Sequence, residues 1–332
     1  MGFLNSLLLT IMRGLHAIIN NYALTIIVFT ILIKLVVMPL NLKSRKSTQR
    51  MSAVQPKLKA LQDKYKDDQE KLNQKMQELY RKEGVSPMGG CLPMIISMFI
   101  LFAMFYAMRT FANEQLVAQF LTFYHNPTID PSTLTDGFLW IKNLWMPDSP
   151  FATYKPDVQS LQLVDFDVWN NVSAQLAASG VIPEVLNFAD RNAMMAYITD
   201  VVTPFIASDA YAPYVAPITG LGNLSILGLI KFTIYQHGNG WFILPIVSVL
   251  TQILMQNMTM AQTMAANPQA GSQKTMLYVM TFMSLYFCAI YNSAFALYWV
   301  ISNIYALVEH IAFDKYFKAQ DRKAATAEEV GI

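Results

Sequence analysis

The stretch "YALTIIVFTILIKLVVMPL", residues 22–40, decides the class of this protein, because it is long and apolar enough to cross a lipid bilayer. A charged lysine at the centre of such a helix costs roughly 2.5 to 3.5 kcal/mol, whereas each Leu, Ile, Val or Phe contributes about 0.3 to 0.6 kcal/mol towards insertion. Twelve such residues outweigh Lys34, so the segment is predicted to span. Charges inside membranes usually face a protein interior or a wet cavity, which makes Lys34 a functional candidate. The competing interpretation is that its side chain reaches back to the cytosolic edge.

The composition indicates a polytopic membrane protein. Of the 332 residues, 54% are hydrophobic and only 14% are charged, whereas soluble domains carry about 25% charged residues. Four further segments approach the roughly 17 to 25 apolar residues of a spanning helix. We therefore predict an all-α fold with five transmembrane helices, at 21–41, 89–111, 240–263, 274–290 and 294–313.

Charged residues are unevenly distributed along the chain. Residues 41–87 hold twelve of the 24 lysines and arginines beside six acids, whereas residues 110–240 hold four basic residues and eleven acids. Because basic loops stay in the cytosol, this distribution predicts an N-out, C-in orientation. Trp140 and Trp145 then fall where an aromatic belt would meet the outer interface.

The segments outside the spans have patterns of their own. Residues 1–20 indicate an interfacial amphipathic helix, with a cleaved signal peptide as the alternative. Residues 42–88 indicate a cytosolic hairpin of two charged helices, in which Asp67 starts the second helix and Gly84 ends it. The apolar stretch 221–235 is short and broken by Gly, Asn and Lys, so we place it outside the membrane or at its surface. The other predicted segments are an extracellular loop and insertion at 112–239, a cytosolic loop at 264–273 and a cytosolic tail at 314–332.

Sparse polar side chains recur at helical spacing within the spans. Thr30 and Lys34 lie one turn apart on the first span, and Gln252 and Gln256 repeat that spacing on the third. Unpaired amides are costly in hydrocarbon, so these groups should face one another or water. Each alone fits a hydrogen bond between helices, but together with Lys34 they favour a common hydrophilic groove. Its predicted lining also includes Ser97, Asn257, Ser302 and Asn303.

Motifs for catalysis and for metal or nucleotide binding are missing from the sequence. There is no phosphate-binding loop, no H-E-x-x-H and no Cys/His cluster, and the predicted spans contain no aspartate. Cys91 and Cys288 fit as small packing residues. We therefore expect neither an enzyme nor a resident cofactor or metal.

The predicted cytosolic hairpin presents a basic face. One interpretation is a solvated surface near anionic headgroups, and the other is a docking site for a ribosome, a targeting factor or a nascent chain. The candidate contact residues are Lys57, Lys59, Lys64, Lys71, Lys75 and Arg81.

Several stretches resemble the YidC/Oxa/Alb family of membrane protein insertases. The most specific is "LYRKEGVSPMGGCLPM" at 79–94, and the similarity resumes at "FILPIVSVLTQILMQNM", residues 242–258, and "FALYWVISNIYALVEH", residues 295–310. The resemblance implies five spans around a groove that is open to the cytosol and to lipid and closed on the outer side. It places Lys34 at the family's basic groove position, which is often Arg, and Thr30, Tyr298 and Trp299 at groove or core positions.

The implied function is a membrane insertase and chaperone. It would move short hydrophilic tails of clients through the groove and release their transmembrane helices into lipid, without ATP and without reading nucleic acid. The expected partners are nascent membrane proteins and the lipid bilayer, with the ribosome, the signal recognition particle pathway and the Sec translocon as further candidates. We expect a multi-pass protein of a bacterial plasma membrane, of a short Gram-positive-like type. The alternatives are a small anion-binding transporter or channel, and a structural scaffold.

Overall fold

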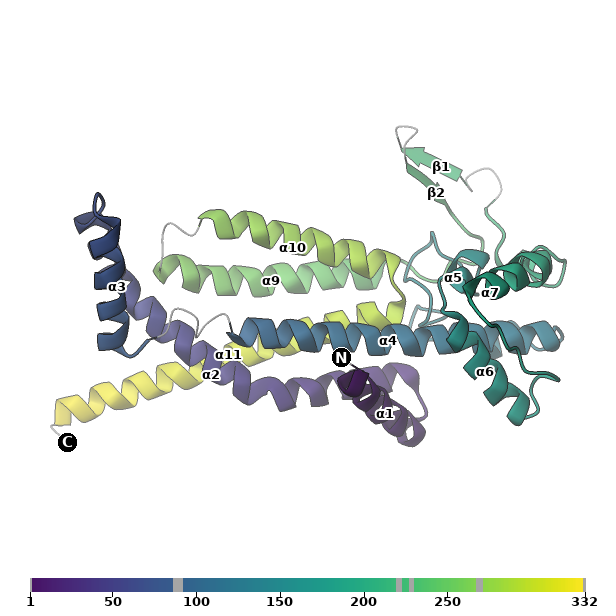
Figure 1. Cartoon of the computed structure of the whole chain (residues 1–332), viewed down its shortest axis with the longest axis horizontal. Helices are drawn as coiled ribbons and strands as arrows, with labels where there is room; N and C mark the ends of the chain where they lie inside the picture. Colours follow the sequence, from purple (N-terminus) through teal and green to yellow (C-terminus); the bar gives the residue numbers. More distant parts are fainter. Residues whose placement is uncertain (1, 86–91, 219–222, 227–229, 267–270, 331–332) are drawn as a thin grey trace. The chain divides into compact units, whose positions relative to one another are not determined.

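The computed structural model describes residues 2–85, 92–218, 223–226, 230–266 and 271–330, and these residues are mostly helical (Figure 1). Short 3-10 turns lie at Pro131–Leu134 and Ala212–Tyr214, and a π-turn lies at Ile198–Val202. The α-helices are α1 Gly2–Ile19, α2 Tyr22–Lys64, α3 Gln69–Glu83, α4 Leu92–His125, α5 Val158–Gln162, α6 Phe166–Ala178, α7 Arg191–Tyr197, α8 Thr203–Ile206, α9 Ile243–Ala266, α10 Gly271–Ile290 and α11 Ser293–Val330.

The chain forms two compact units, and each is described by itself. The first unit comprises Met1–Ile27, Ala103–Ser248 and Ser284–Trp299. The second comprises Val28–Phe102, Val249–Met283 and Val300–Ile332.

The first predicted span and the first hairpin helix form a single helix. α2 runs for 43 residues and passes through Pro39 and Pro56. The first arm of the predicted hairpin is therefore the continuation of α2 rather than a separate helix, because the charged residues after Leu40 continue the helix without a cap. The turn comes only after Lys64, and α3 begins at Gln69 with Asp68, rather than Asp67, as its N-cap.

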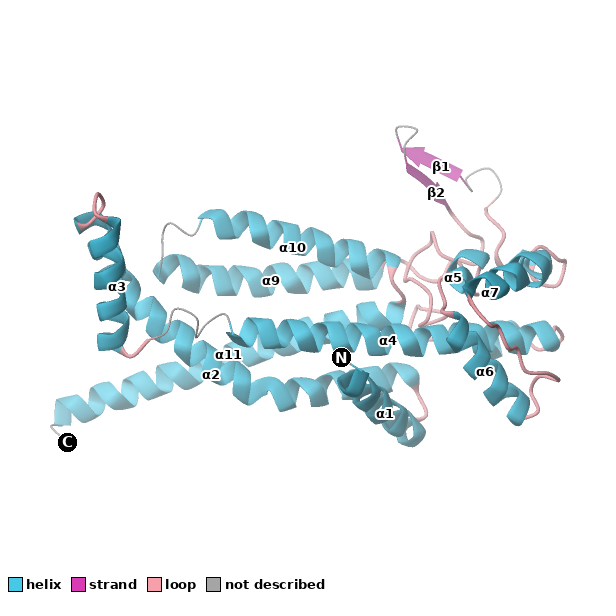
Figure 2. Cartoon of the chain, viewed as in Figure 1, coloured by secondary structure: helices cyan, strands magenta, loops and turns pink. Residues whose placement is uncertain are grey.

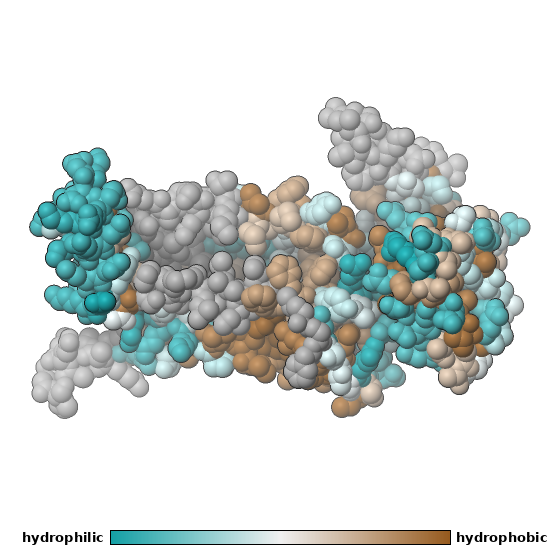
Figure 3. All heavy atoms as spheres, viewed as in Figure 1, coloured by the Kyte–Doolittle hydropathy of each residue, from teal (hydrophilic) through white to brown (hydrophobic). Residues whose placement is uncertain are grey.

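The two ends of α3 follow simple capping rules. The Asp68 side chain accepts from the backbone nitrogen of Lys71 at 3.0 Å, which satisfies a free donor at the helix start. Gly84 ends the helix in the left-handed conformation with φ of 60°, as its position in the sequence predicts. Hydrophilic side chains cover α3, with Leu72 as its buried residue (Figure 3).

The second predicted span continues well beyond residue 111, since α4 ends only at His125. Residues 112–125, which we predicted as part of the extracellular loop and insertion, continue the helix because tertiary packing covers them. Phe120 and Phe123 are buried, and the rings of Trp169 and Tyr211 lie 6.0 and 6.4 Å from the Phe120 ring. The C-terminal part of α4 is therefore the core of the domain formed by α5 to α8.

A two-stranded hairpin departs from the all-α prediction (Figure 2). β1 Asn223–Ile226 pairs antiparallel with β2 Ile230–Thr233, with Asn223 opposite Thr233 and Ile226 opposite Ile230. The sequences NLSI and IKFT alternate polar and apolar residues, which is the period of a strand rather than of a helix.

Long apolar helices are present in the described part of the chain. Two of them, within Tyr22–Lys64 and Ser293–Gln320, are long and apolar enough to cross a membrane. Shorter apolar helices lie at Leu4–Ile19, Ile243–Met258 and Tyr278–Ile290. Five spans remain a prediction.

A buried carboxylate organises the first unit near the start of α9. Asp148 is fully buried, and its Oδ2 accepts from the Trp140 indole nitrogen at 3.1 Å and from the Leu244 backbone nitrogen at 2.7 Å. Its Oδ1 accepts from the Trp241 backbone nitrogen at 2.9 Å. Negative charge is favoured beside these free donors of a helix N-terminus. A Cβ at Gly240 would lie 2.0 Å from Asp148 Oδ1, so the site requires glycine.

Two buried asparagines extend this arrangement into what we call the clasp, residues 143–148 and 239–244. Asn239 Nδ2 donates to three backbone oxygens of the 143–147 segment, at 2.8, 3.0 and 2.9 Å. Asn143 Nδ2 donates to Gln119 Oε1 on α4 at 2.8 Å. The backbone nitrogens of Ser293 and Ala294 donate to clasp oxygens at 2.9 and 2.8 Å. The clasp therefore joins α4, α9 and α11 within the first unit.

Trp145 belongs to the clasp rather than to a membrane interface. Its side chain is 1% exposed, and its indole nitrogen donates to Asp136 Oδ2 at 2.6 Å. Its ring packs edge-on against Tyr22 and Phe111, with ring centres 5.0 and 5.7 Å away. The predicted interfacial position of Trp145 was wrong, and Trp241, at 73% exposed, is the exposed tryptophan of this region.

We expect Asp148→Ala to lower the free energy of unfolding by about 3 kcal/mol or more, because three buried donors lose their acceptor. Thermal unfolding in detergent, followed by tryptophan fluorescence, measures this loss. Asp165→Ala is the matched control, since Asp165 precedes α6, is exposed and forms no side-chain cap hydrogen bond. That control should cost less than about 0.5 kcal/mol. Equal losses in the two variants would contradict the assigned role of the clasp.

Candidate functional site

The structure places Lys34 and Thr30 one helical turn apart on α2, in the second unit. Thr30 is fully buried and Lys34 is partly buried. The Glu309 carboxylate of α11 and Lys34 attract each other electrostatically. No direct ion pair of 4 Å or less joins the two among the described residues, so their attraction acts over a longer distance.

Glu309 belongs to a small polar cluster where α2 packs against α11. Asn41 Nδ2 lies 3.3 and 3.1 Å from the two carboxylate oxygens of Glu309. Arg45 Nη1 donates to the backbone oxygen of His310 at 3.1 Å, and its guanidinium lies 5.8 Å from the ring centre of Phe313. Both Lys34 and Arg45 are attracted by the Glu309 charge.

Two predicted groove residues form hydrogen bonds between helices. Gln256 Oε1 accepts from Thr281 Oγ1 at 2.9 Å, which joins α9 to α10. Asn303 Nδ2 donates to Thr251 Oγ1 at 3.2 Å, which joins α11 to α9. These bonds fit the simpler interpretation that polar groups in the spans hold helices together.

The other predicted lining residues have different surroundings. Ser302 is buried, and its hydroxyl has no hydrogen-bond partner among the described residues. Gln252 is partly exposed and Asn257 is exposed. The side chain of Ser97 lies outside the described residues, as does Cys91.

Tyr298 and Trp299 lie in the first unit, among aromatic side chains. Their ring centres lie 6.1 and 5.6 Å from that of Phe295. Tyr298 is 5% exposed, and Phe295 also packs against Phe105 on α4 with ring centres 5.3 Å apart. This setting is that of a packed core.

The six basic residues predicted as contacts on the hairpin also differ from one another. Lys64 Nζ lies 5.5 Å from the centre of the Tyr65 ring. Lys59 and Arg81 are exposed and form no ion pair within the described part of the chain. Carboxylates lie 2.6, 3.5 and 2.7 Å from the amines of Lys57, Lys71 and Lys75.

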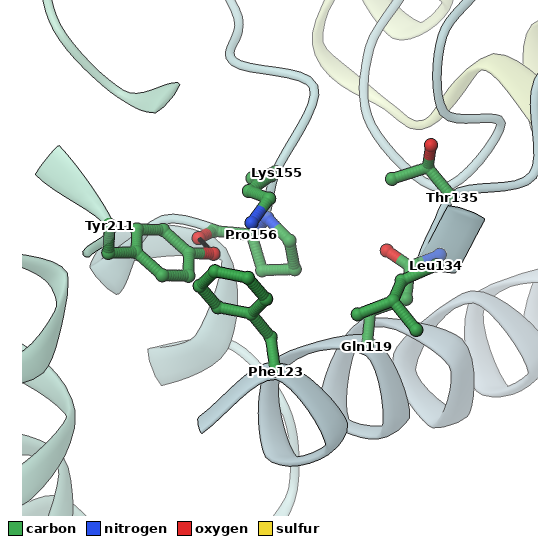
Figure 4. Close-up of a pocket in the computed structure, with 7 residues that line it drawn as sticks. All are labelled: Gln119, Phe123, Leu134, Thr135, Lys155, Pro156 and Tyr211. Atoms are coloured by element: carbon green, nitrogen blue, oxygen red, sulfur yellow. Dashed lines mark hydrogen bonds between the residues drawn. The ribbon is translucent and has the colours of Figure 1, made fainter. Parts of the chain in front are cut away.

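Lys155 is the most unusual cation in the first unit. It is 3% exposed, and its Nζ has no hydrogen-bond partner among the described residues. The amine lies 3.3 and 4.8 Å from the ring centres of Phe123 and Tyr211 (Figure 4). It also lies 4.1 Å from the ring centre of Tyr214. Such rings attract a cation. Burial nevertheless lowers the pKa of Lys155 to about 7, against a smaller opposing effect of Asp130.

Two cavities lie near Lys155, and no predicted groove residue lines either one. The first has about 10 Å³, room for about one water, between Lys155, Gln119 and Thr135. The second is an open pocket of about 360 Å³. It is lined by Ser132, Thr135, Gly137, Lys142, Tyr154 and His237.

No group of three metal-ligating side chains occurs within the residues that the structure describes. Cys288 is a buried free thiol near the hydroxyls of Ser248 and Ser284. Its surroundings are those of a packing residue.

Sequence reasoning missed Glu309, Asn41 and Arg45. The available signal was that the predicted span 294–313 contains an acid, Glu309, while the predicted span 21–41 contains a lysine, Lys34. It also missed Lys155, one of only four basic residues between 110 and 240, and the buried Asp148.

A family model described as "60Kd inner membrane protein" matches residues 14–321. Three proteins named "Membrane protein insertase YidC" are similar to this chain. Those of Chlorobaculum tepidum, Chlorobium limicola and Prosthecochloris aestuarii are 43%, 41% and 42% identical over 149, 147 and 147 residues. These matches cover 44 to 45% of the chain but only 22% of each relative, so the chain spans a minor part of their length.

We expect Lys155 to make the stability of the protein depend on pH. An unfolded lysine keeps its proton up to about pH 10.4, whereas the folded amine loses its proton near pH 7. Between these values the unfolded state binds more protons, so stability rises with pH. From pH 7 to pH 9 the wild type should gain about 2 kcal/mol relative to Lys155→Met.

Thermal unfolding at pH 7, 8 and 9 tests this dependence. Lys142→Met is the control, because Lys142 is exposed and should leave the slope of the wild type unchanged. A parallel pH dependence in Lys155→Met and the wild type would show that Lys155 is not the titrating group.

Proposed function

Because the chain belongs to the 60Kd inner membrane protein family, we propose that it inserts client proteins into a lipid bilayer. Its family resemblance is confirmed, and the relatives that match it are named as membrane protein insertases. The observation that carries the proposal is Lys34, a partly buried cation within an apolar helix. A charge at this depth is costly unless it faces water or a partner.

The proposed groove lies along α2 beside Lys34 and Thr30, with polar groups of α9 and α11 as further lining. A wet groove shortens the hydrocarbon distance that a client's polar tail must cross. The ammonium of Lys34 attracts acidic residues of that tail. Burial of about 20 apolar residues of the client helix in lipid then drives release, so no nucleotide site is needed.

The clasp makes the first unit a closely packed body. Its hydrogen bonds join α4, α9 and α11, and Trp145 packs against Tyr22 and Phe111. We propose that the groove is closed on its outer side, as the family resemblance implies. A transporter or channel, in contrast, needs a path that opens to both faces.

We place residues 42–88 and 314–332 in the cytosol of a bacterial cell and residues 112–239 outside its plasma membrane. The hairpin of α3 and the end of α2 then faces the side from which nascent chains arrive. Lys59 and Arg81 are its exposed candidates for contact with a ribosome or targeting factor. Cooperation with the Sec translocon is part of the same proposal.

Reconstitution in liposomes tests the function and the role of Lys34. Clients with one apolar helix and a short tail carrying two Asp or two Ser are offered to the wild type, Lys34→Ala and Lys34→Arg. We expect Lys34→Ala to reduce insertion of the acidic client roughly fivefold, since a charge pair in a wet site contributes about 1 kcal/mol. Lys34→Arg should keep most of the activity, and the neutral client should change little.

The same liposomes report on the competing function. Loss of chloride or phosphate flux in Lys34→Ala, without insertion of either client by the wild type, would identify an anion transporter instead. Equal insertion of the acidic client by the wild type and Lys34→Ala would remove Lys34 from the mechanism.

A further inference from the structure

We propose that Glu309 is the resident counter-charge of Lys34, and that it sets how strongly the groove prefers acidic client tails. This inference rests on the insertase function proposed above. In the empty protein, Glu309 attracts Lys34, and a carboxylate of the client tail takes over that attraction when it enters. Glu309 is thus a specificity-determining residue.

The surroundings of Glu309 hold its carboxylate in place. Asn41 Nδ2 lies within hydrogen-bond distance of both oxygens, at 3.3 and 3.1 Å, and the residue is partly buried on α11. An amide neutralises no charge, so the negative charge remains available to the cations of α2. Asn41 therefore positions the carboxylate, and Lys34 and Arg45 balance its negative charge.

Arg45, the second cation near Glu309, contacts other groups instead. Arg45 donates to the His310 backbone oxygen at 3.1 Å and lies over the Phe313 ring. Lys34 has no such contact among the described residues. It lies two helical turns before Asn41 on α2, so it shares a helix face with the residue that contacts Glu309. Glu309 is also the carboxylate whose charge acts on Lys34. Since the two do not form a direct ion pair, their attraction is moderate and an incoming carboxylate can compete with it.

The charge pattern has a consequence for client choice. Without Glu309, the field of Lys34 would be stronger and acidic tails would be favoured more. With it, the groove holds one charge of each sign, so neutral tails and tails with basic residues are tolerated. Glu309 therefore widens the range of clients at the expense of affinity for acidic ones.

The test uses the full chain in liposomes and three clients that differ only in the tail, with two Asp, two Ser or two Lys. The measured quantity is the ratio of acidic to neutral client inserted. We expect Glu309→Gln to raise this ratio about fivefold, since a solvent-accessible charge pair contributes up to about 1 kcal/mol. Insertion of the basic client should fall. In the Lys34→Ala background, Glu309→Gln should change the ratio less than about twofold, because the partner is absent.

Asn41→Ala is the matched control, because it removes the hydrogen bonds to Glu309 but leaves every charge in place. Its acidic-to-neutral ratio should stay within about twofold of the wild type. The same shift in Asn41→Ala and Glu309→Gln would assign Glu309 a structural role and overturn the inference. An unchanged ratio in Glu309→Gln, or an equal shift with and without Lys34, would also overturn it.

A charge swap, Lys34→Glu with Glu309→Lys, covers the case in which Glu309→Gln inserts no client. The swapped pair should restore insertion and move the preference towards the basic client, and failure to do so would reject the pairing. If the wild type inserts none of the three clients, the proposed function itself fails. If the wild type inserts the clients and Glu309→Gln leaves the acidic-to-neutral ratio unchanged, only the present inference fails.

Discussion

The buried carboxylate of Asp148 is the interaction on which the first unit depends. A charge without solvent contact is stable only when donors surround it, and here two backbone nitrogens and an indole supply them. The same residue fixes the start of α9 and excludes any side chain at Gly240. Neighbouring asparagines then join the starts of α9 and α11 to α4. A segment without regular secondary structure thus fixes the starts of two helices, α9 and α11, and attaches both to α4.

Polar groups in the second unit follow a different rule. They are few and lie on apolar helices, and they pair across helix boundaries through Gln256, Asn303 and Asn41. Lys34 and Glu309 are the exception, because their charges act on each other without direct contact. In the proposed insertase function, this separation leaves Lys34 able to attract a carboxylate of a client, which a closed ion pair would not allow.

Hydropathy and capping signals predicted what depends on local sequence. The break between α10 and α11 falls at the polar residues 291–293, between the two predicted spans 274–290 and 294–313, and Gly84 ends α3 as expected. The continuous α2 was missed because a change from apolar to charged residues resembles a boundary. The extension of α4 depends on packing by Trp169 and Tyr211, which are distant in sequence. Glu309 could be noticed as an acid in a span, but its pairing with Lys34 needed the fold.

The uninterrupted course of α2 has a mechanical consequence. From Lys34 to Lys64 the helix rises about 45 Å at 1.5 Å per residue, so one rod connects Lys34 to the turn before α3. Each internal proline removes a backbone hydrogen bond and softens the rod at that point. Pro39 and Pro56 therefore act as two joints, which divide α2 into an apolar arm that carries Lys34, a middle section and a tip that leads to α3. A load on the tip is transmitted to Lys34 only as far as these joints resist bending.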